Sequence, residues 1–186
     1  MRGGWRVATV AALLVIGSTF PSARAASGRH CAIQLIPTSR HGSVIDSKAT
    51  LVGCYATFSQ AISAGSRGTI SLDADMTPDQ LRDSDLATAS PLSSVLIGTE
   101  FNALAFGGAS NDYFAATACA GTDVWDVNYV GDGLNDTFSS GKGFGGCDHN
   151  KKFQDADFSG NVLTCTPNCN DYGSLSNQVS SLRWRP

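Results

Sequence analysis

The stretch Phe101-Asn-Ala-Leu-Ala-Phe106-Gly-Gly108 occurs twice in related form, the second time as Phe153-Gln-Asp-Ala-Asp-Phe158-Ser-Gly160. Each copy has an aromatic residue, a second aromatic residue five positions later, and a glycine two positions after that. A polar cluster ending in Ser-Ser follows each copy: first Asn135-Asp136-Thr137-Phe138-Ser139-Ser140, then Ser176-Asn177-Gln178-Val179-Ser180-Ser181. Two copies of one supersecondary unit, neither of which can bury its apolar face alone, predict one domain built from two units.

Short apolar runs separated by Gly, Asn, Asp and Ser indicate that this domain is all β, because no long helical period interrupts them. Gly108 and Gly160 fall where a hairpin needs positive φ or a close backbone approach. Four antiparallel strands with one long return connection make a Greek key, and two Greek keys packed face to face bury both apolar faces. The expected strands include Val95–Gly98, Asp112–Phe114, Val124–Val127, Gly143–Phe144, Lys152–Phe153, Val162–Leu163 and Leu182–Trp184.

These residues resemble the signature of the βγ-crystallin superfamily, which joins the aromatic and glycine pattern to Asn/Asp-Asn/Asp-x-x-Ser/Thr-Ser. The first copy matches this signature in full, and the second departs from it only at Ser176. The resemblance covers residues 93–186 and implies a two-Greek-key βγ-crystallin-like sandwich. The whole chain also resembles secreted bacterial proteins in which a small Cys-containing module precedes such a domain.

Microbial members of the superfamily bind calcium, so the resemblance implies up to two Ca²⁺ ions, each held by residues of both copies. Calcium takes six to eight oxygen ligands in flexible geometry, which suits hydroxyl, amide and carbonyl oxygens. One expected site combines Asn135, Asp136, the Gln178 carbonyl, the Ser180 hydroxyl and the hairpin carbonyl of Asn102. The other combines Asn177, the Thr137 carbonyl, the Ser139 hydroxyl and the hairpin carbonyl of Gln154.

The charge of these ligands predicts weak binding. Asp136 is the only carboxylate in the two polar clusters, and Ser176 replaces an expected Asn or Asp. A low charge count favours dissociation constants on the order of 10⁻⁴–10⁻³ M, as in extracellular calcium modules. The site with Asp136 is expected to be the stronger. The alternative is that both clusters are purely structural, because Ser and Asn side chains readily cap turns.

Residues 1–25 have the pattern of a signal peptide. Arg2 and Arg6 precede an apolar run, Val7–Phe20, and Ala23-Arg24-Ala25 is a small-x-small cleavage site. We therefore expect a secreted, extracellular protein that starts at Ala26; the alternative is an N-terminal membrane anchor. No later segment is apolar enough to span a bilayer.

The charge balance excludes two classes of partner. The leader holds three of the 13 Lys and Arg and none of the 16 Asp and Glu, so the remainder is more acidic than the net charge of −3 for the whole chain. Such a balance argues against binding to nucleic acid or to anionic membranes. We expect a monomer whose partners are calcium ions and, in one alternative, a protein target such as a protease.

All six cysteines follow the cleavage site, and an even count in an exported chain indicates disulfides. Six cysteines allow fifteen connectivities. We predict pairing between neighbours in sequence: Cys31–Cys54, Cys119–Cys147 and Cys165–Cys169. A zinc site at Cys165-Thr-Pro-Asn-Cys169 is the alternative, but no second pair of ligands with matching spacing follows.

Residues 26–92 predict a small α/β module joined to the β domain by a linker, Ala87–Ser94. Its expected strands are Cys31–Ile36, Thr50–Cys54 and Thr69–Leu72. A short helix should follow Thr57 and end at Gly65, because glycine stops helices. A second helix should run from Thr77 to about Leu86, since Thr77, Pro78 and Gln80 hold the cap, first and third positions.

The sequence lacks the motifs of common enzyme classes, and we predict a non-enzymatic, disulfide-stabilised calcium-binding protein. The acidic stretch at Asp73–Asp79 has Pro78 where an EF-hand needs glycine, and no P-loop, HExxH or nucleophile-elbow pattern occurs. Secreted relatives of this fold include metalloprotease inhibitors and killer toxins, which is the alternative function. The loop Cys165–Cys169 and the segment Asn111–Val130 would then contact the target. A third alternative assigns partner binding to residues 26–92.

Overall fold

The computed structural model describes residues 30–86, 94–119 and 121–186, and its nine strands form one sheet in the order β6-β3-β4-β1-β2-β5-β9-β7-β8. The predicted leader, residues 1–25, lies outside the described residues, as do 87–93 of the predicted linker. No helix of the described part has the length and apolar character needed to cross a membrane. The strands are β1 (His30–His41), β2 (Val44–Tyr55), β3 (Val95–Phe101), β4 (Ser110–Ala115), β5 (Val124–Val127), β6 (Ser140–Gly143), β7 (His149–Phe153), β8 (Val162–Cys165) and β9 (Ser181–Arg185).

The strands of the two repeated units are interleaved. In the first unit β3 pairs antiparallel with β4 and β6, but β5 pairs with β9 of the second unit. In the second unit β7 pairs with β8 and β9, while Cys169 makes an antiparallel bridge to Gly141 of the first. Each unit therefore gives one segment to the sheet of the other, as in two interlocked Greek keys. The predicted, mainly β, two-Greek-key fold is confirmed.

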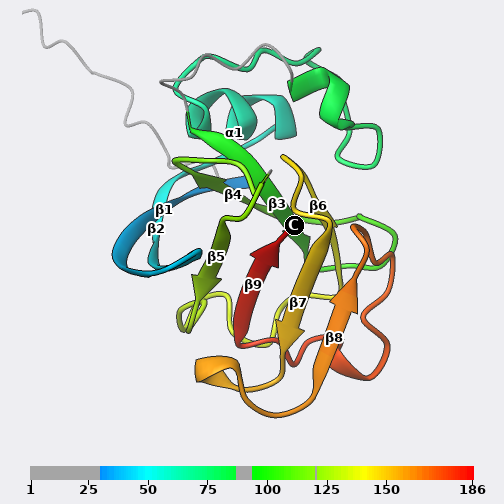
Figure 1. Ribbon diagram of the computed structural model, residues 1–186. Helices are drawn as coiled ribbons and strands as arrows, with labels where there is room; N and C mark the ends of the chain where they lie inside the picture. Colours follow the sequence, from blue (N-terminus) through cyan, green and yellow to red (C-terminus); the bar gives the residue numbers. More distant parts are fainter. Residues whose placement is uncertain (1–29, 87–93, 120) are drawn as a thin grey trace, which may run out of the picture.

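The hairpin β1–β2 lies in the sheet between two groups of strands, β6-β3-β4 on one side and β5-β9-β7-β8 on the other. It turns at Gly42, whose φ is 63°, and β1 runs parallel to β4 while β2 runs parallel to β5. In Figure 1 this hairpin (blue to cyan) curves along one side of the molecule. It pairs with the strands that would otherwise be the open edges of the sandwich. Backbone hydrogen bonds thus cross the predicted boundary between 26–92 and 93–186.

Helix α1 (Phe58–Gly65) confirms the first predicted helix. Thr57 caps it: the Thr57 hydroxyl accepts from the Gln60 N–H, and the Gln60 side chain accepts from the Thr57 N–H. The helix buries Phe58 and Ile62 in a small core cluster with Phe114 and neighbouring side chains. In Figure 1 it lies above β3 and β4.

Two predictions for the N-terminal part are wrong. The Thr77–Leu86 helix is replaced by turns and a short 3₁₀ segment, η1 (Asp83–Leu86). The reason is that Lys142 Nζ donates to three carbonyl oxygens that a helix would use, those of Pro78, Asp79 and Leu81.

The predicted strand at Thr69–Leu72 is also absent. The Ile70 N–H donates to Ser66 Oγ rather than to a neighbouring strand, and the Thr69 N–H donates to the Ser66 carbonyl. Ile70 is buried in the cluster beneath α1, which explains the apolar pattern without a strand.

The main core lies between the two groups of strands, and the repeated aromatic residues pack as expected. Phe101 and Phe106 stack edge to face with ring centroids 5.7 Å apart, and Phe153 and Phe158 do so at 5.5 Å. Gly108 has φ of 75°, and a Cβ there would lie 2.2 Å from Asn102 Oδ1. The remaining short 3₁₀ segments are η2 (Ala156–Phe158) and η3 (Gly173–Leu175).

The three predicted disulfides are confirmed as Cys31–Cys54, Cys119–Cys147 and Cys165–Cys169. The first joins β1 to β2 across the hairpin, at paired positions of the ladder. The third closes the loop after β8, so both cysteines of the alternative zinc site are in a disulfide.

Removal of the hairpin disulfide should destabilise the protein. Cys31 and Cys54 are separated by 23 positions in the sequence. Replacing both by Ser opens this loop, and loop entropy predicts a loss of about 3 kcal/mol in the free energy of unfolding. The matched double variant at Cys165 and Cys169, separated by four residues, should lose only about 2 kcal/mol. Urea denaturation of both variants measures the difference. A larger loss at the short loop would contradict this prediction.

Asp112 is a buried carboxyl group in β4, fully covered, with Ser110 Oγ donating to its Oδ2 at 3.1 Å. Burial raises the pKa of Asp112 to about 7. An unfolded Asp has a pKa near 4, so from about pH 4 to 7 the folded state binds more protons at this position than the unfolded state. The contribution of Asp112 to stability is therefore present at low pH and is lost as the pH rises through 7.

Asp112→Asn should remove this pH dependence. The neutral amide has almost the same shape as the protonated carboxyl group, so the variant should nearly match the wild type at pH 4 and exceed its free energy of unfolding at pH 8 by on the order of 4 kcal/mol. Urea unfolding at the two pH values tests this. A variant that is less stable than the wild type at pH 8 would show that Asp112 is needed in its charged form.

Candidate metal centre

The two polar clusters lie against each other because each donates a backbone hydrogen bond to the other. The Asp136 N–H donates to the Val179 carbonyl at 3.2 Å, and the Asn177 N–H donates to the Phe138 carbonyl at 2.7 Å. Asp136 and Asn177 hold equivalent positions and both have left-handed backbones, with φ of 58° and 57°. The repeat in sequence is thus also a repeat in conformation.

One hollow of about 420 Å³ gathers six of the nine predicted ligands. Ser180 Oγ donates to the Gln154 carbonyl at 2.7 Å, and Gln154 Nε2 donates to Gln178 Oε1 at 3.2 Å. Oxygen atoms from both repeated units therefore lie within one small volume. The lining residues are Asn135, Asp136, Gln154, Asp155, Asn177, Gln178 and Ser180.

The assignment of the two hairpin carbonyls is a correction to the sequence analysis. Ser180 lies beside Gln154, not Asn102, because β9 pairs with β7 of the same unit and the Ser180 N–H donates to the Phe153 carbonyl. For the same reason the Ser139 N–H donates to the Phe101 carbonyl, which brings Ser139 next to the Asn102 hairpin. The predicted hairpin ligands are exchanged: Gln154 belongs with Asp136, and Asn102 with Asn177.

Two features of the hollow suit a cation. Asn135 Oδ1 is buried, yet the described residues offer it no hydrogen-bond donor. Its own Nδ2 donates to Asp136 Oδ2 at 2.8 Å, and a second carboxylate residue, Asp155, lines the same hollow. A buried oxygen without a partner is costly unless a cation or water satisfies it.

Asp155 was missed because the sequence analysis examined only the two polar clusters and the hairpin carbonyls. Alignment of the hairpins pairs Gln154-Asp155 with Asn102-Ala103, so the signal was a carboxylate in one copy where the other has alanine. The hollow beside Asp136 holds two carboxylates, which favours calcium binding more than the single one expected.

The second predicted site has no carboxylate among its expected ligands, and two of its ligand atoms already bond each other: Ser139 Oγ donates to Asn177 Oδ1 at 3.2 Å. The bonds made by Thr137 and Asn102 involve their side chains and leave the carbonyls expected as ligands aside. The described residues contain no group of three or more His, Cys, Asp or Glu side chains that could hold a metal. The oxygen set beside Asp136 fits calcium; the set beside Asn177 fits it less well.

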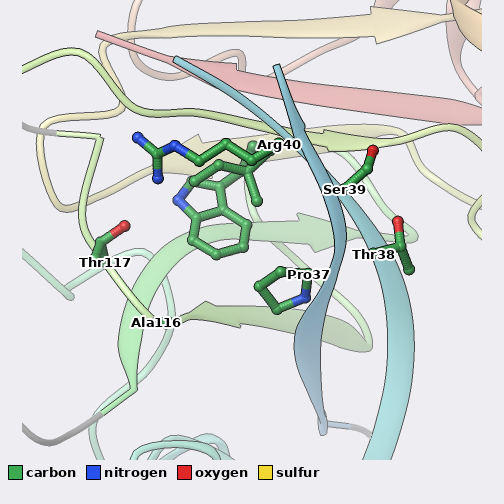
Figure 2. A pocket seen from close by; sticks show the side chains of 8 residues that line it. Pro37, Thr38, Ser39, Arg40, Ala116 and Thr117 are labelled. Atoms are coloured by element: carbon green, nitrogen blue, oxygen red, sulfur yellow. The ribbon is translucent and has the colours of Figure 1, made fainter. Parts of the chain in front are cut away.

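A separate hollow of about 260 Å³ lies between β1 and the segment after β4 (Figure 2). Pro37 and Arg40 line one side, and Thr117 lines the other. Arg40 Nη2 pairs with Asp123 Oδ1 at 2.6 Å, and Thr117 Oγ1 donates to Asp123 Oδ2 at 2.7 Å. None of the predicted calcium ligands lines it, so it is distinct from the metal centre.

Comparison with known proteins finds similarity only to solved structures: no family model and no curated protein matches the chain. A βγ-crystallin from an archaeon is 24% identical, with a TM-score of 0.36, and the match covers 48% of this chain and 96% of that one. The N-terminal domain of Protein S is 23% identical over 47% of this chain and 92% of its own, with a TM-score of 0.35. A βγ-crystallin domain from Flavobacterium johnsoniae is 20% identical over 47% and 91%, with a TM-score of 0.34.

Proposed function

We propose that this protein is a secreted, disulfide-stabilised calcium-binding protein without enzymatic activity, and that the hollow beside Asp136 holds its stronger site. The observation that carries the proposal is the buried, unpartnered Asn135 Oδ1 in a hollow that two carboxylate residues, Asp136 and Asp155, also line. The residues that would hold the ion are Asn135, Asp136, Gln154, Asp155, Gln178 and Ser180. The ion would supply positive charge that neutralises both carboxylates.

Calcium at this position would link the two Greek keys. Asn135 and Asp136 belong to the first unit, whereas Gln154, Asp155 and Ser180 belong to the second. An ion that binds only the folded state adds RT ln(1 + [L]/Kd) to stability, or about 1.4 kcal/mol at ten times Kd. The function that follows is calcium-dependent stability outside the cell.

Export and the absence of catalysis are supported by different observations. Three disulfides among the described residues suit an oxidising compartment, and the predicted leader supplies the route to it. The non-enzymatic role is supported by the sequence, in which none of the motifs considered for hydrolases, NTPases or metalloproteases occurs.

Calcium titration of two single variants tests the proposal. Asp136→Asn and Asp155→Asn should each weaken calcium binding about fivefold or more, because each removes one of the two charged ligands. Isothermal titration calorimetry measures the dissociation constants. Asp148→Asn, an equal change of charge outside the hollow, and Ser139→Ala, at the second site, should leave the stronger site unchanged.

The Asp155→Asn variant is the decisive one, because Asp155 lies outside the two polar clusters and lines the same hollow as Asp136. If the wild type shows no heat of binding at millimolar calcium, the proposal fails. If Asp136→Asn weakens binding and Asp155→Asn does not, the site is confined to the polar clusters.

A further inference from the structure

A buried ion pair joins the two repeated units at equivalent positions. Glu100 and Lys152 directly precede the first aromatic residue of each copy, Phe101 and Phe153. Their side chains are 0% and 1% exposed, and Lys152 Nζ contacts Glu100 Oε1. The Tyr172 hydroxyl donates to the other carboxylate oxygen, Oε2. The calcium proposal does not involve this cluster.

The ammonium group of Lys152 is poorly satisfied. Among the described residues its one hydrogen-bond acceptor is Glu100 Oε1, and its other neighbours are the rings of Tyr172 and Trp184, with centroids 5.8 and 5.5 Å from Nζ. Lys142 provides an internal comparison, because it also lies over aromatic rings but donates to three carbonyl oxygens at 3.1, 3.1 and 2.9 Å. An ammonium has three N–H donors, and Lys142 uses all of them.

We propose that Lys152 Nζ and Glu100 Cδ form an intramolecular amide bond, a covalent cross-link between the two Greek keys. The nucleophile is held against the carboxyl group by the Nζ–Oε1 contact, and both side chains are buried, which is an arrangement that favours condensation between two bound groups. The product suits the site better than the ion pair does, because an amide carries no charge and has one N–H instead of three.

The surroundings of the pair favour the neutral forms that the reaction needs. Burial raises the pKa of Glu100 and lowers that of Lys152, although the attraction between the two charges opposes both shifts. Transfer of one proton from Nζ to Oε1 within the pair gives an amine and a carboxylic acid. A neutral amine is a nucleophile, whereas an ammonium is not.

The bond-forming step can then be written with every atom accounted for. The lone pair of Nζ attacks Cδ of Glu100, and the negative charge that develops on Oε2 is stabilised by the Tyr172 hydroxyl. The Cδ–Oε1 bond breaks as a proton passes from Nζ to the departing hydroxyl, and one water molecule leaves. No oxidant, metal or co-reactant takes part.

The mass of the wild-type protein tests the proposal directly. After reduction of the disulfides, the intact protein should be lighter than its sequence by one water molecule. A tryptic digest should contain residues 83–142 covalently joined to residues 152–183, because trypsin does not cleave after a modified Lys152. A protein of full mass, or a water loss that maps to any other pair of residues, would overturn the proposal.

Three variants test which residues form the amide bond and which one promotes it. Lys152→Met should restore the full mass, whereas Lys142→Met, the same change at the other buried lysine, should still lose water. Tyr172→Phe keeps the pair and removes the hydroxyl, so it should leave a substantial fraction of the chains unlinked; complete linkage in this variant would contradict the role given to Tyr172. The wild-type measurement decides the main question even if a variant fails to fold.

Discussion

The exchange of strands between the two Greek keys is the constraint on which the rest of the structure depends. Because β5 pairs with β9 and Cys169 pairs with Gly141, neither unit can complete its sheet alone. The same exchange brings the two polar clusters together, since each follows a strand or segment donated to the other unit. The hollow lined by residues of both copies is therefore a consequence of topology, and its lining cannot assemble within one half of the domain.

The hairpin β1–β2 extends this constraint to the N-terminal part of the chain. Without the hairpin, β4 and β5 would each lie at an open edge of the sheet, and exposed edges invite pairing with other chains. The hairpin covers both edges by parallel pairing, and Cys31–Cys54 holds its strands together. The outer backbone hydrogen bonds of β1 and β2 are made to β4 and β5. Strands from residues 26–92 and from residues 93–186 therefore share one continuous sheet.

The sequence predicted those features that depend on local pattern. The Thr57 cap, the aromatic hairpins and the strands of residues 93–186 follow from short-range spacing, and the structure agrees with each; the strand expected at Thr69–Leu72 is absent. It could not predict the path of 77–86, because a single distant side chain, Lys142, takes the carbonyls that a helix would need. Nor could it pair the Gln154 hairpin with the Ser180-Ser181 segment, since that pairing depends on the register between β7 and β9.

The differences between the two copies have a physical reason where equivalent residues meet. At the contact between the units, identical copies would place Glu against Glu or Lys against Lys in a buried site, and two like charges without water are strongly unfavourable. Glu100 and Lys152 avoid this by having opposite charges. The hollow beside Asp136 shows the complementary case, because Asp136 and Asp155 come from different copies and line one hollow. Sequence divergence therefore places opposite charges at the core contact and two carboxylates in the hollow between the polar clusters.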